Sequence, residues 1–537
     1  MPQHAGIRNV LPWIAAVASG TMAFLGYAGF DHFYLEWICL VPILWAIRGQ
    51  RPSRAFLMGW VAGTVGHGGG FYWIVHMFQQ FAGLAWPLAA LGLLLIAAAN
   101  GIVFAVWAGT VRLITHDTGW NIVWVSPAVW TALEKFWPEI FPNYLGASQY
   151  QLTLLTQIAD VTGILGVTFL VVYTNSLIYA AIDAKQNQRP FPPRLVMVFA
   201  AAVALAIGYG AVRIHMVDQQ ASIAEKLTVG VVQTDCAAEE KYTEPARLLL
   251  KHQEMSKDIA AASAVDLIVW PEGICSLNLF ASRQGELPSD VLASLNKPVL
   301  FGAILRIEQS GSPRIYNSAV LANGAGKILG TYDKMILVPF GEYIPFGDMF
   351  PWLYTWSPYS SHFWPGENKE PLQFGTHLLS VNICYEDIFP GQVRLLMNGG
   401  RYHRVPEAMF NLTDDSWYGN TVEPTEHLAL AVFRAIEHRR PLVRTTNTGI
   451  SAIVDPVGRI DQRIRQWTKG TLVGPIPMMH GRTVYAMMGD WLGWLCAILA
   501  LLGTGRAYQL TGRRAKSKMV PETKGKKRRE NLSAQHR

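Results

Sequence analysis

Eight long apolar segments constrain the fold of this chain more than any other feature of its sequence. Seven come first and one follows a long polar interval: they run at roughly 10–30, 33–47, 55–78, 84–111, 120–137, 162–182, 195–214 and 484–504. A helix needs about 20 apolar residues to cross the hydrocarbon core of a bilayer. Most of the segments approach that length, and the second is the shortest. The sequence therefore predicts eight transmembrane helices.

Composition and charge agree with a chain that lies partly in a bilayer. Only 15% of its 537 residues are charged, whereas about 25% are charged in an ordinary soluble domain. Basic residues gather in alternate connections between the apolar segments: Arg8, Arg48, Arg51, Arg54, Arg112, Lys185, Arg189 and Arg194. Cytoplasmic loops carry such an excess of positive charge. Both termini are therefore predicted to be cytoplasmic.

The predicted organisation has four parts. Residues 1–214 form a membrane domain with seven helices, 215–483 a domain outside the cytoplasm, 484–504 the eighth helix and 505–537 a basic cytoplasmic tail. Residues 506–537 hold eleven Lys or Arg and two Glu. A run of this kind can bind nucleic acid, but positive charge is also usual on the cytoplasmic side of a membrane span. We favour the second interpretation and expect no nucleic-acid partner.

The domain outside the cytoplasm alternates between short apolar runs and helical patterns. The apolar runs are Leu227–Val232, Leu267–Trp270, Val299–Ile304, Ser318–Leu321, Leu378–Ile383, Ala408–Leu412, Leu442–Thr446 and Ile450–Val454. Helical patterns cover Glu244–Ala262 and Glu426–His438. Strands interleaved with helices are typical of an α/β fold in which helices cover the faces of the sheets.

Three of the predicted strands lead to residues that can perform chemistry: Glu272, Lys334 and Cys384. Strand ends gather at one edge of an open α/β sheet, so the three could converge. Glu272 could then take the thiol proton while the sulfur attacks an ester or amide carbonyl, and Lys334 could stabilise the oxyanion. Taken singly, Glu272 could instead cap a helix, Lys334 could be a surface lysine and Cys384 a buried structural cysteine.

The remaining cysteines and the histidines do not indicate a disulfide framework or a metal site. Four cysteines besides Cys384 lack paired spacing: Cys39, Cys236, Cys275 and Cys496. Cys275 follows Glu272 closely but lacks the strand-to-turn setting of Cys384. The histidines are dispersed, without the spacing of metal ligands. We therefore expect neither a metal nor another cofactor.

The order of these motifs resembles the apolipoprotein N-acyltransferase family, bacterial membrane enzymes that complete lipoprotein triacylation. The resemblance rests on WPE at 270–272, YDKMILVPFGEYIP at 332–345, NICYED at 382–387, NLTDDSWYG at 411–419 and HLALAVFRAIEHRRPLVRTTNTG at 427–449. It extends into the membrane domain, at EKFWPEIFPNYLGASQ (134–149) and GVTFLVVYTN (166–175). It implies that the outer domain is a nitrilase-like αββα sandwich, as in the carbon–nitrogen hydrolases, placed before the last transmembrane helix.

The resemblance also implies roles for individual residues. The family's catalytic triad falls on Glu272, Lys334 and Cys384. Three further positions match residues that support the triad: Glu342, Tyr385 and Glu386. Three positions depart from the family pattern, since Tyr242 stands where Trp is common, Asp414 where Asn is usual and Ser416 where Ala is usual. These departures concern the substrate loops and not the triad.

Residues 335–364 carry ten aromatic side chains, no Lys or Arg, and only two acids. A soluble domain would rarely expose such a run, and Trp and Tyr favour the headgroup level of a membrane. We predict an arm that lies on the outer leaflet and gates the active site, with an ordinary packed insertion as the alternative. The candidate substrate or lid residues are Tyr242, Trp352, Trp356 and Trp417.

The resemblance implies an acyltransferase that moves a fatty acyl chain from a phospholipid, through a Cys384 thioester, to the α-amine of the diacylglyceryl-cysteine of an apolipoprotein. The expected partners are the phospholipid donor, the diacylated lipoprotein acceptor and the bilayer. We expect a monomer in the bacterial inner membrane, with the catalytic domain in the periplasm. Two alternatives stay open: a membrane-tethered nitrilase-type amidase with the same triad, and a non-enzymatic lipid-binding protein with a decayed nitrilase domain.

Overall fold

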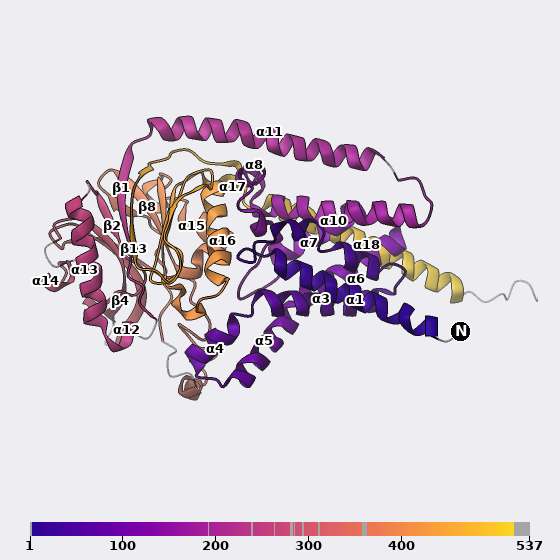
Figure 1. Cartoon of the computed structure of the whole chain (residues 1–537), viewed down its shortest axis with the longest axis horizontal. Helices are drawn as coiled ribbons and strands as arrows, with labels where there is room; N and C mark the ends of the chain where they lie inside the picture. Colours follow the sequence, from indigo (N-terminus) through magenta and orange to yellow (C-terminus); the bar gives the residue numbers. More distant parts are fainter. Residues whose placement is uncertain are drawn as a thin grey trace, which may run out of the picture.

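The computed structural model describes residues 3–519 except 192, 238–239, 263, 280–282, 284, 293–294, 310–311 and 357–361. A helical part lies beside a part built on two β-sheets (Figure 1). The N-terminus and the end of the last helix lie at the same end of the helical part, away from the sheets (Figure 1). The predicted tail beyond Met519 falls outside the described residues.

The helical part consists of long helices joined by short ones. Its longer helices are α1 (Gln3–Gly26), α3 (Pro52–Gly70), α4 (Ile74–Ala82), α5 (Trp86–Asn100), α6 (Ile102–Thr118), α7 (Ile122–Phe136), α10 (Ile164–Gln186), α11 (Pro193–Ile223) and α18 (Trp491–Met519). Its short helices are η1 (Phe33–Trp37), α2 (Val41–Ala46), η2 (Leu145–Gln149), α8 (Thr153–Thr156), α9 (Ala159–Thr162) and α17 (Val484–Met488).

Five helical stretches of the described chain are long and apolar enough to cross a membrane: Asn9–Gly26, Trp86–Thr118, Ile164–Gln186, Pro193–Ile223 and Trp491–Arg513. They coincide with five of the eight predicted segments. The other three predicted segments contain α2, α3 and α7, which are shorter or less apolar. The count of eight crossings therefore stays a prediction.

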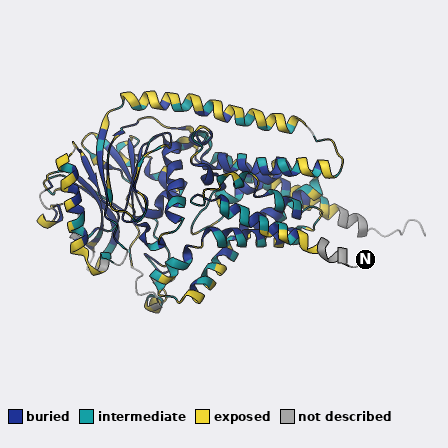
Figure 2. Ribbon diagram, viewed as in Figure 1, coloured by how far each residue is buried: buried dark blue, intermediate teal, exposed yellow. Residues whose placement is uncertain are grey.

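Two helices end or begin later than the apolar pattern predicts. α11 continues past residue 214 to Ile223, so the sheet-containing part begins only with β1 at Lys226. The outward face of α11 is exposed along most of its length (Figure 2). The last long helix begins at Trp491 rather than at residue 484, because Gly489, with φ +63°, ends α17. A left-handed glycine is a common way to terminate a helix.

The β-rich part contains two sheets. The first has the strand order β13-β1-β2-β4-β5-β6, with β3 paired to β4, and the second has the order β12-β11-β10-β9-β8-β7. The strands of the first sheet are β1 (Lys226–Gln233), β2 (Leu267–Val269), β3 (Cys275–Leu279), β4 (Val299–Gln309), β5 (Ser312–Ala322), β6 (Ile328–Asp333) and β13 (Gly470–Pro477). Those of the second are β7 (Leu372–Phe374), β8 (His377–Ile383), β9 (Ala408–Thr413), β10 (Leu442–Thr446), β11 (Ala452–Val454) and β12 (Ile460–Arg463).

Helices cover the outer faces of the two sheets and complete an αββα arrangement. α13 (Pro245–Ala262) lies on the side away from the helical part, with the short helices α12 (Glu240–Thr243) and α14 (Ser289–Leu292) nearby (Figure 1). α15 (Pro390–Leu396) and α16 (Glu423–His438) lie between the second sheet and the membrane helices (Figure 1). The predicted α/β class, the two predicted helices and the eight predicted strands are confirmed, with bounds shifted by a few residues.

The strand directions bring several strand ends to one edge of the domain. β8, β9 and β10 are parallel neighbours, with Ile383 in register with Leu412 and Thr446 with Thr413. Their carboxyl ends therefore lie together, and the turns η4 (Cys384–Ile388) and η6 (Asp415–Tyr418) follow β8 and β9. Apolar side chains of both sheets, such as Val229 and Leu379, share one buried core, which holds the two sheet edges in a fixed relation.

Candidate active site

Cys384 lies where a buried strand stops. The β8 residues from Leu378 to Ile383 are buried, and η4 begins at Cys384 itself. The backbone of Cys384 has a φ of +51°, in the left-handed region that non-glycine residues rarely adopt. Asn411 of β9 donates from Nδ2 to the Cys384 carbonyl at 2.8 Å. A strained residue held in this way by its neighbours is typical of functional sites.

Glu272 reaches the site from the first sheet. It follows β2 and the buried Trp270, and its own side chain is buried. Gly302 of β4 makes this approach possible, because a Cβ atom at Gly302 would lie 2.4 Å from the Cα of Glu272. No residue with a side chain fits there without moving the backbone that carries the carboxylate.

Lys334 follows β6 and is only 1% exposed. Its Nζ lies 2.9 Å from Oε2 of Glu342 and 3.4 Å from Oε1 of Glu272. Burial acts to lower the pKa of Lys334, but the charges of Glu272 and Glu342 outweigh it and hold that pKa well above its usual range. Lys334 is therefore a permanent cation between two carboxylates.

Asn317 is a part of the site that the sequence did not reveal. It lies on β5, is buried, and donates from Nδ2 to Oε1 of Glu272 and to Oε1 of Glu342, both at 2.6 Å. The backbone N–H of Val338 donates to the other oxygen of Glu342 at 2.8 Å. The sequence carried no clear signal for it, because Asn317 precedes the predicted run Ser318–Leu321 and its partners are 25 and 45 residues away.

Glu386 joins the turn η4, which begins at the candidate nucleophile Cys384 and is called the nucleophile turn below, to the loop that carries Lys334. Its carboxylate accepts from the backbone N–H of Ile383 at 2.8 Å, from that of Met335 at 2.7 Å, and from the Tyr332 hydroxyl at 2.9 Å. Burial raises the pKa of Glu386 to about 7. One buried side chain thus fixes the distance between two strand ends that come from different sheets.

Tyr385, the residue after Cys384, packs toward the helical part. Its ring centroid lies 5.8 Å from that of Phe141 and 5.0 Å from that of Phe389. The neighbouring Tyr418 lies 5.0 Å from Trp73 of the helical part. Aromatic side chains of the two parts therefore pack against each other beside Cys384.

The converging residues line one cavity with a volume of about 150 Å³. Its polar lining includes Lys241, Glu272, Asn317, Lys334, Glu342, Cys384 and Asp414. Burial and the charge of Glu272 raise the pKa of the Cys384 thiol well above its usual range, despite the opposing charge of Lys334. Burial also raises the pKa of Glu272, again against Lys334. A neutral thiol beside a carboxylate of raised pKa is an arrangement suited to proton transfer from sulfur to oxygen.

Lys241 and Asp414 form an ion pair at the wall of this cavity. Lys241 Nζ lies 2.6 Å from Asp414 Oδ2, and it donates to the main-chain carbonyl of Glu272 at 2.7 Å. The pair explains one departure from the family pattern, since an Asp at position 414 supplies the negative charge that the buried lysine needs. Ser416, a second departure, donates from both its backbone N–H and its hydroxyl to Oδ1 of Asp414.

The other predicted residues lie at different distances from the thiol. Trp417 lines the cavity, as does Cys275, which lies on β3 and whose pKa burial raises to about 12. Trp352 belongs to η3 (Pro351–Trp356) and is 52% exposed. Tyr242 belongs to α12. The side chains of Tyr242 and Trp356 fall outside the described residues.

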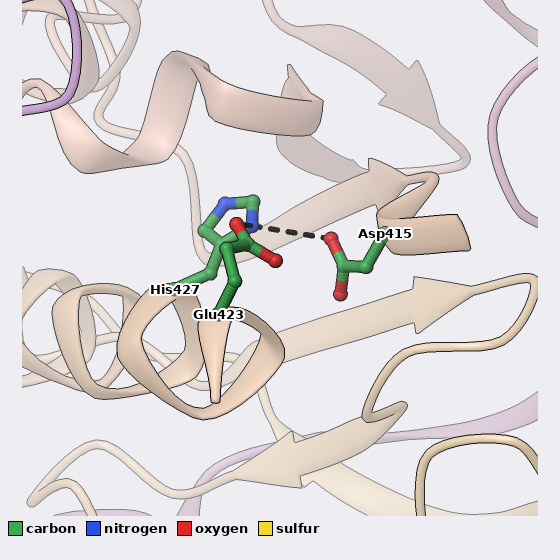
Figure 3. A group of neighbouring side chains, drawn as sticks. All are labelled: Asp415, Glu423 and His427. Carbon is green, nitrogen blue, oxygen red and sulfur yellow. Dashed lines mark hydrogen bonds and ion pairs between the residues drawn. The ribbon is translucent and has the colours of Figure 1, made fainter. Parts of the chain in front are cut away.

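A second cluster beside the nucleophile turn contains Asp415, Glu423 and His427 (Figure 3). It is the one group of possible metal ligands within the part of the chain that the structure describes. Arg444 already supplies a cation there, because its Nη2 lies 2.7 Å from Asp415 Oδ2 and 3.0 Å from His427 Nδ1. The donor set is therefore that of a buried ion-pair network and does not suit a metal ion.

Two family models match this chain, and the chain is similar to known proteins over most of its length. The model of the apolipoprotein N-acyltransferase N-terminal domain matches residues 19–177, and that of the carbon–nitrogen hydrolase domain matches residues 228–484. The apolipoprotein N-acyltransferase of Geobacter metallireducens is 29% identical over 511 residues, which cover 93% of this chain and 95% of that protein. The apolipoprotein N-acyltransferase of Azotobacter vinelandii is 30% identical over 521 residues, which cover 94% of this chain and 95% of that protein.

Proposed function

The chain belongs to the apolipoprotein N-acyltransferase family, and we propose the route by which it acylates lipoproteins. It is an acyltransferase of lipoprotein maturation with a nitrilase-like domain. The observation that carries the route is the cavity in which Cys384, Glu272 and Lys334 meet. In this route a phospholipid gives its acyl chain to Cys384, and the α-amine of a diacylglyceryl-cysteine then receives it.

The first half of the cycle forms a thioester. Glu272 accepts the proton of the Cys384 thiol as the sulfur attacks the ester carbonyl of the phospholipid. The oxygen of the tetrahedral intermediate becomes negative and is stabilised by the Lys334 ammonium and by the backbone N–H that follows Cys384. The intermediate collapses with cleavage of the carbon–oxygen bond. Glu272 returns the proton to the departing alkoxide, and a lysophospholipid leaves.

The second half transfers the acyl chain to nitrogen. The neutral α-amine of the acceptor attacks the thioester carbonyl, and Glu272 takes a proton from the nitrogen. The carbon–sulfur bond breaks, the amide forms, and Glu272 reprotonates the thiolate of Cys384. Glu342 and Asn317 hold Lys334 and Glu272 in place through both halves, because each bonds to a charged group of the pair.

The position of the cavity supports access from the lipid phase. Tyr418 lines the cavity, and its ring lies 5.0 Å from that of Trp73 in the helical part. The segment that follows Lys334 in the sequence exposes several large apolar side chains: Phe340, Phe346, Met349, Phe350, Trp352 and Trp364. We take this segment as the arm that lies on the outer leaflet and gates the site, since a thioester must be shielded from water.

The membrane topology that goes with this route has eight crossings, cytoplasmic termini and a catalytic domain over residues 215–483 in the periplasm of a bacterial inner membrane. The N-terminus and the carboxyl end of α18 lie at the end of the helical part that is away from the sheets, which supports this topology (Figure 1). We propose that the protein acts as a monomer, because every residue of the triad and its supports comes from one chain.

Trapping the acyl-enzyme tests the route. The purified full-length protein is incubated with phospholipid vesicles without acceptor, and the peptide that contains Cys384 is examined by mass spectrometry. We expect a fatty acyl thioester on Cys384 that disappears when a diacylglyceryl-cysteine lipopeptide is added. Cys384→Ser should form no thioester, whereas Cys275→Ser, the matched change in the same cavity, should form it. Release of ammonia from small amides without acyl transfer would instead identify an amidase.

A further inference from the structure

A buried threonine hydroxyl lies between the Cys384 sulfur and a cluster of charged residues. Thr413 is the last residue of β9 and is fully buried. The parallel register that pairs Ile383 with Leu412 places Thr413 beside Cys384, and a hydrogen bond from the Thr413 side chain acts to lower the pKa of the Cys384 thiol. The same hydroxyl oxygen lies 3.2 Å from Oδ1 of Asp415. Thr413 therefore lies beside both the residue that carries the reacting sulfur and a carboxylate.

Asp415 is in turn held by two cationic side chains. His427 Nδ1 lies 3.2 Å from Asp415 Oδ1 (Figure 3), and Arg444 Nη2 lies 2.7 Å from Asp415 Oδ2. His427 reaches back to the nucleophile turn, since its Nε2 lies 2.7 Å from Oδ1 of Asp387. Burial and Arg444 act to lower the pKa of His427, but its contacts with the two aspartates outweigh them and raise that pKa to about 9.

The network formed by Asp415, His427 and Arg444 also reaches the backbone of Cys384. Arg444 donates from Nη1 to the side-chain oxygen of Asn411 at 3.0 Å, and Asn411 donates to the Cys384 carbonyl at 2.8 Å. Each of these side chains is buried. The network thus fixes both the backbone of Cys384, through Asn411, and the group beside its sulfur, through Asp415.

A hydroxyl has one hydrogen and two lone pairs, so Thr413 can donate to only one neighbour at a time. While the thiol is neutral, the hydrogen can point to Asp415. When Glu272 removes the thiol proton, the sulfur becomes an anion and competes for that hydrogen. His427 and Arg444 offset the charge of Asp415 and weaken its hold on Thr413, which favours rotation of the hydroxyl toward sulfur.

We propose that Thr413 is a further catalytic residue, whose hydroxyl donates to the Cys384 sulfur as it becomes a thiolate, and that Asp415, His427 and Arg444 are positioning residues for that hydroxyl. The proposal rests on Cys384 being the nucleophile of the proposed function. It does not require that the acyl donor be a phospholipid.

Alkylation of Cys384 by iodoacetamide tests this role without any acyl substrate. The full-length protein is alkylated over a range of pH, and modification is followed on the Cys384 peptide by mass spectrometry. Thr413→Val keeps the shape of the side chain and removes the hydroxyl. We expect the midpoint of its pH profile to move to higher pH and its rate at neutral pH to fall roughly tenfold, the usual effect of losing a hydrogen bond to a charged group. Thr413→Ser should retain both values.

The charged and titratable groups that face the thiol, and so shape the same profile, are Glu272, Lys334, Asp415 and the neutral phenols of Tyr385 and Tyr418. None of them is changed in these variants. Thr445→Val is the matched control, because Thr445 is an equally buried threonine of the neighbouring strand β10 whose hydroxyl donates to the Val232 carbonyl. It should leave the profile of Cys384 unchanged.

His427→Gln probes the positioning residues. It should move the midpoint in the same direction by a smaller amount and should add nothing to Thr413→Val in the double variant, because both act through one hydroxyl. A wild-type profile for Thr413→Val, or an equal shift for Thr445→Val, would overturn the proposal. If Thr413→Val does not fold, Thr413→Ala carries the same test. A Thr413-dependent profile without acylation by phospholipid would refute the proposed function and leave this role in place.

Discussion

The side-chain amide of Asn317 lies 2.6 Å from Oε1 of Glu272, across two strands of the first sheet. The same Nδ2 atom lies 2.6 Å from Oε1 of Glu342. Two carboxylates that would repel each other are therefore joined by one donor pair on one side and by the Lys334 ammonium on the other. The orientation of the proposed base depends on a residue that takes no part in proton transfer.

Asn317→Ala should lower the rate of thioester formation by roughly 10- to 100-fold, because each hydrogen bond to a charged group contributes about 1.5–3 kcal/mol. The pre-steady-state rate of Cys384 acylation measures the effect. Asn398→Ala, at an exposed asparagine of the same domain, is the control and should acylate at the wild-type rate. An unchanged rate in Asn317→Ala would show that Lys334 alone orients the base.

The acid limb of the activity profile, where activity rises with pH, should lie at a higher pH than the usual pKa range of a carboxyl group. Burial raises the pKa of Glu272 and Lys334 opposes that shift, and only the ionised carboxylate accepts the thiol proton. Activity should therefore rise with pH through this raised pKa. Lys334→Met removes the opposing charge, so the acid limb should move to higher pH and kcat should fall roughly 100-fold or more.

The pH profile of single-turnover acylation measures both effects. Lys327→Met, at an exposed lysine of the turn before β6, should leave the profile unchanged. A Lys334→Met enzyme with the wild-type acid limb would mean that another group sets the protonation of Glu272.

Glu386 should make the stability of the protein depend on pH. Folding raises its pKa to about 7, so the folded state favours the protonated form. Its stabilising contribution is complete below the ordinary carboxyl pKa of about 4.3 and is lost as the pH rises through about 7. Relative to Glu386→Gln, which stays neutral, the wild type should lose free energy of unfolding between about pH 4 and about pH 7. Thermal unfolding in detergent at several pH values measures the difference, and a constant difference would contradict the prediction.

The Lys241–Asp414 pair should behave as a unit. Asp414→Asn takes the carboxylate away from a lysine whose side chain is only 11% exposed, and should destabilise the protein by about 3 kcal/mol, the lower end of the cost of breaking a buried ion pair. Lys241→Met combined with Asp414→Asn should recover most of that loss. Chemical unfolding of the two single variants and the double variant completes the cycle. Additive effects would mean that the two residues do not interact in solution.

The proposed arm should matter for lipid substrates more than for folding. Trp352 is 52% exposed and Phe346 is 74% exposed on the described part of the arm. Replacing Trp352 and Trp356 with Ser should reduce acylation from vesicles roughly tenfold, since aromatic side chains anchor segments at the headgroup level. Iodoacetamide alkylation of Cys384 in detergent should not change. Equal acylation by wild type and variant on vesicles would show that the segment is a packed insertion.

Much of the fold was predictable because it depends on local patterns. Apolar runs of about 20 residues mark the membrane helices wherever they occur, and alternating strands and helices mark an α/β domain. Cys384 could be singled out because Leu378–Ile383 is an apolar strand that ends abruptly at a thiol. The motif order around Glu272, Lys334 and Cys384 then pointed to one family, to which the chain belongs.

What the sequence did not reveal are contacts between distant positions. Asn317 precedes Glu342 by 25 residues and follows Glu272 by 45, and their bonds exist only because β5 lies beside β4 and β6 in one register. The Lys241–Asp414 pair and the contacts of Asp415 with Arg444 and of His427 with Asp387 likewise join distant positions. In the sequence, Asp414 was only a departure from a pattern.

The sequence by itself determined that the chain enters a membrane, that its polar interval folds as an α/β domain, and that a thiol, a carboxylate and an ammonium stand at strand ends. Hydrophobic periodicity carries that information because burial acts on each segment separately. Only the tertiary structure decided which carboxylates share Lys334, which hydroxyl lies beside the Cys384 sulfur, and how the nucleophile turn is held. Those choices depend on strand order and register, which bring together charges that must be paired once water is excluded.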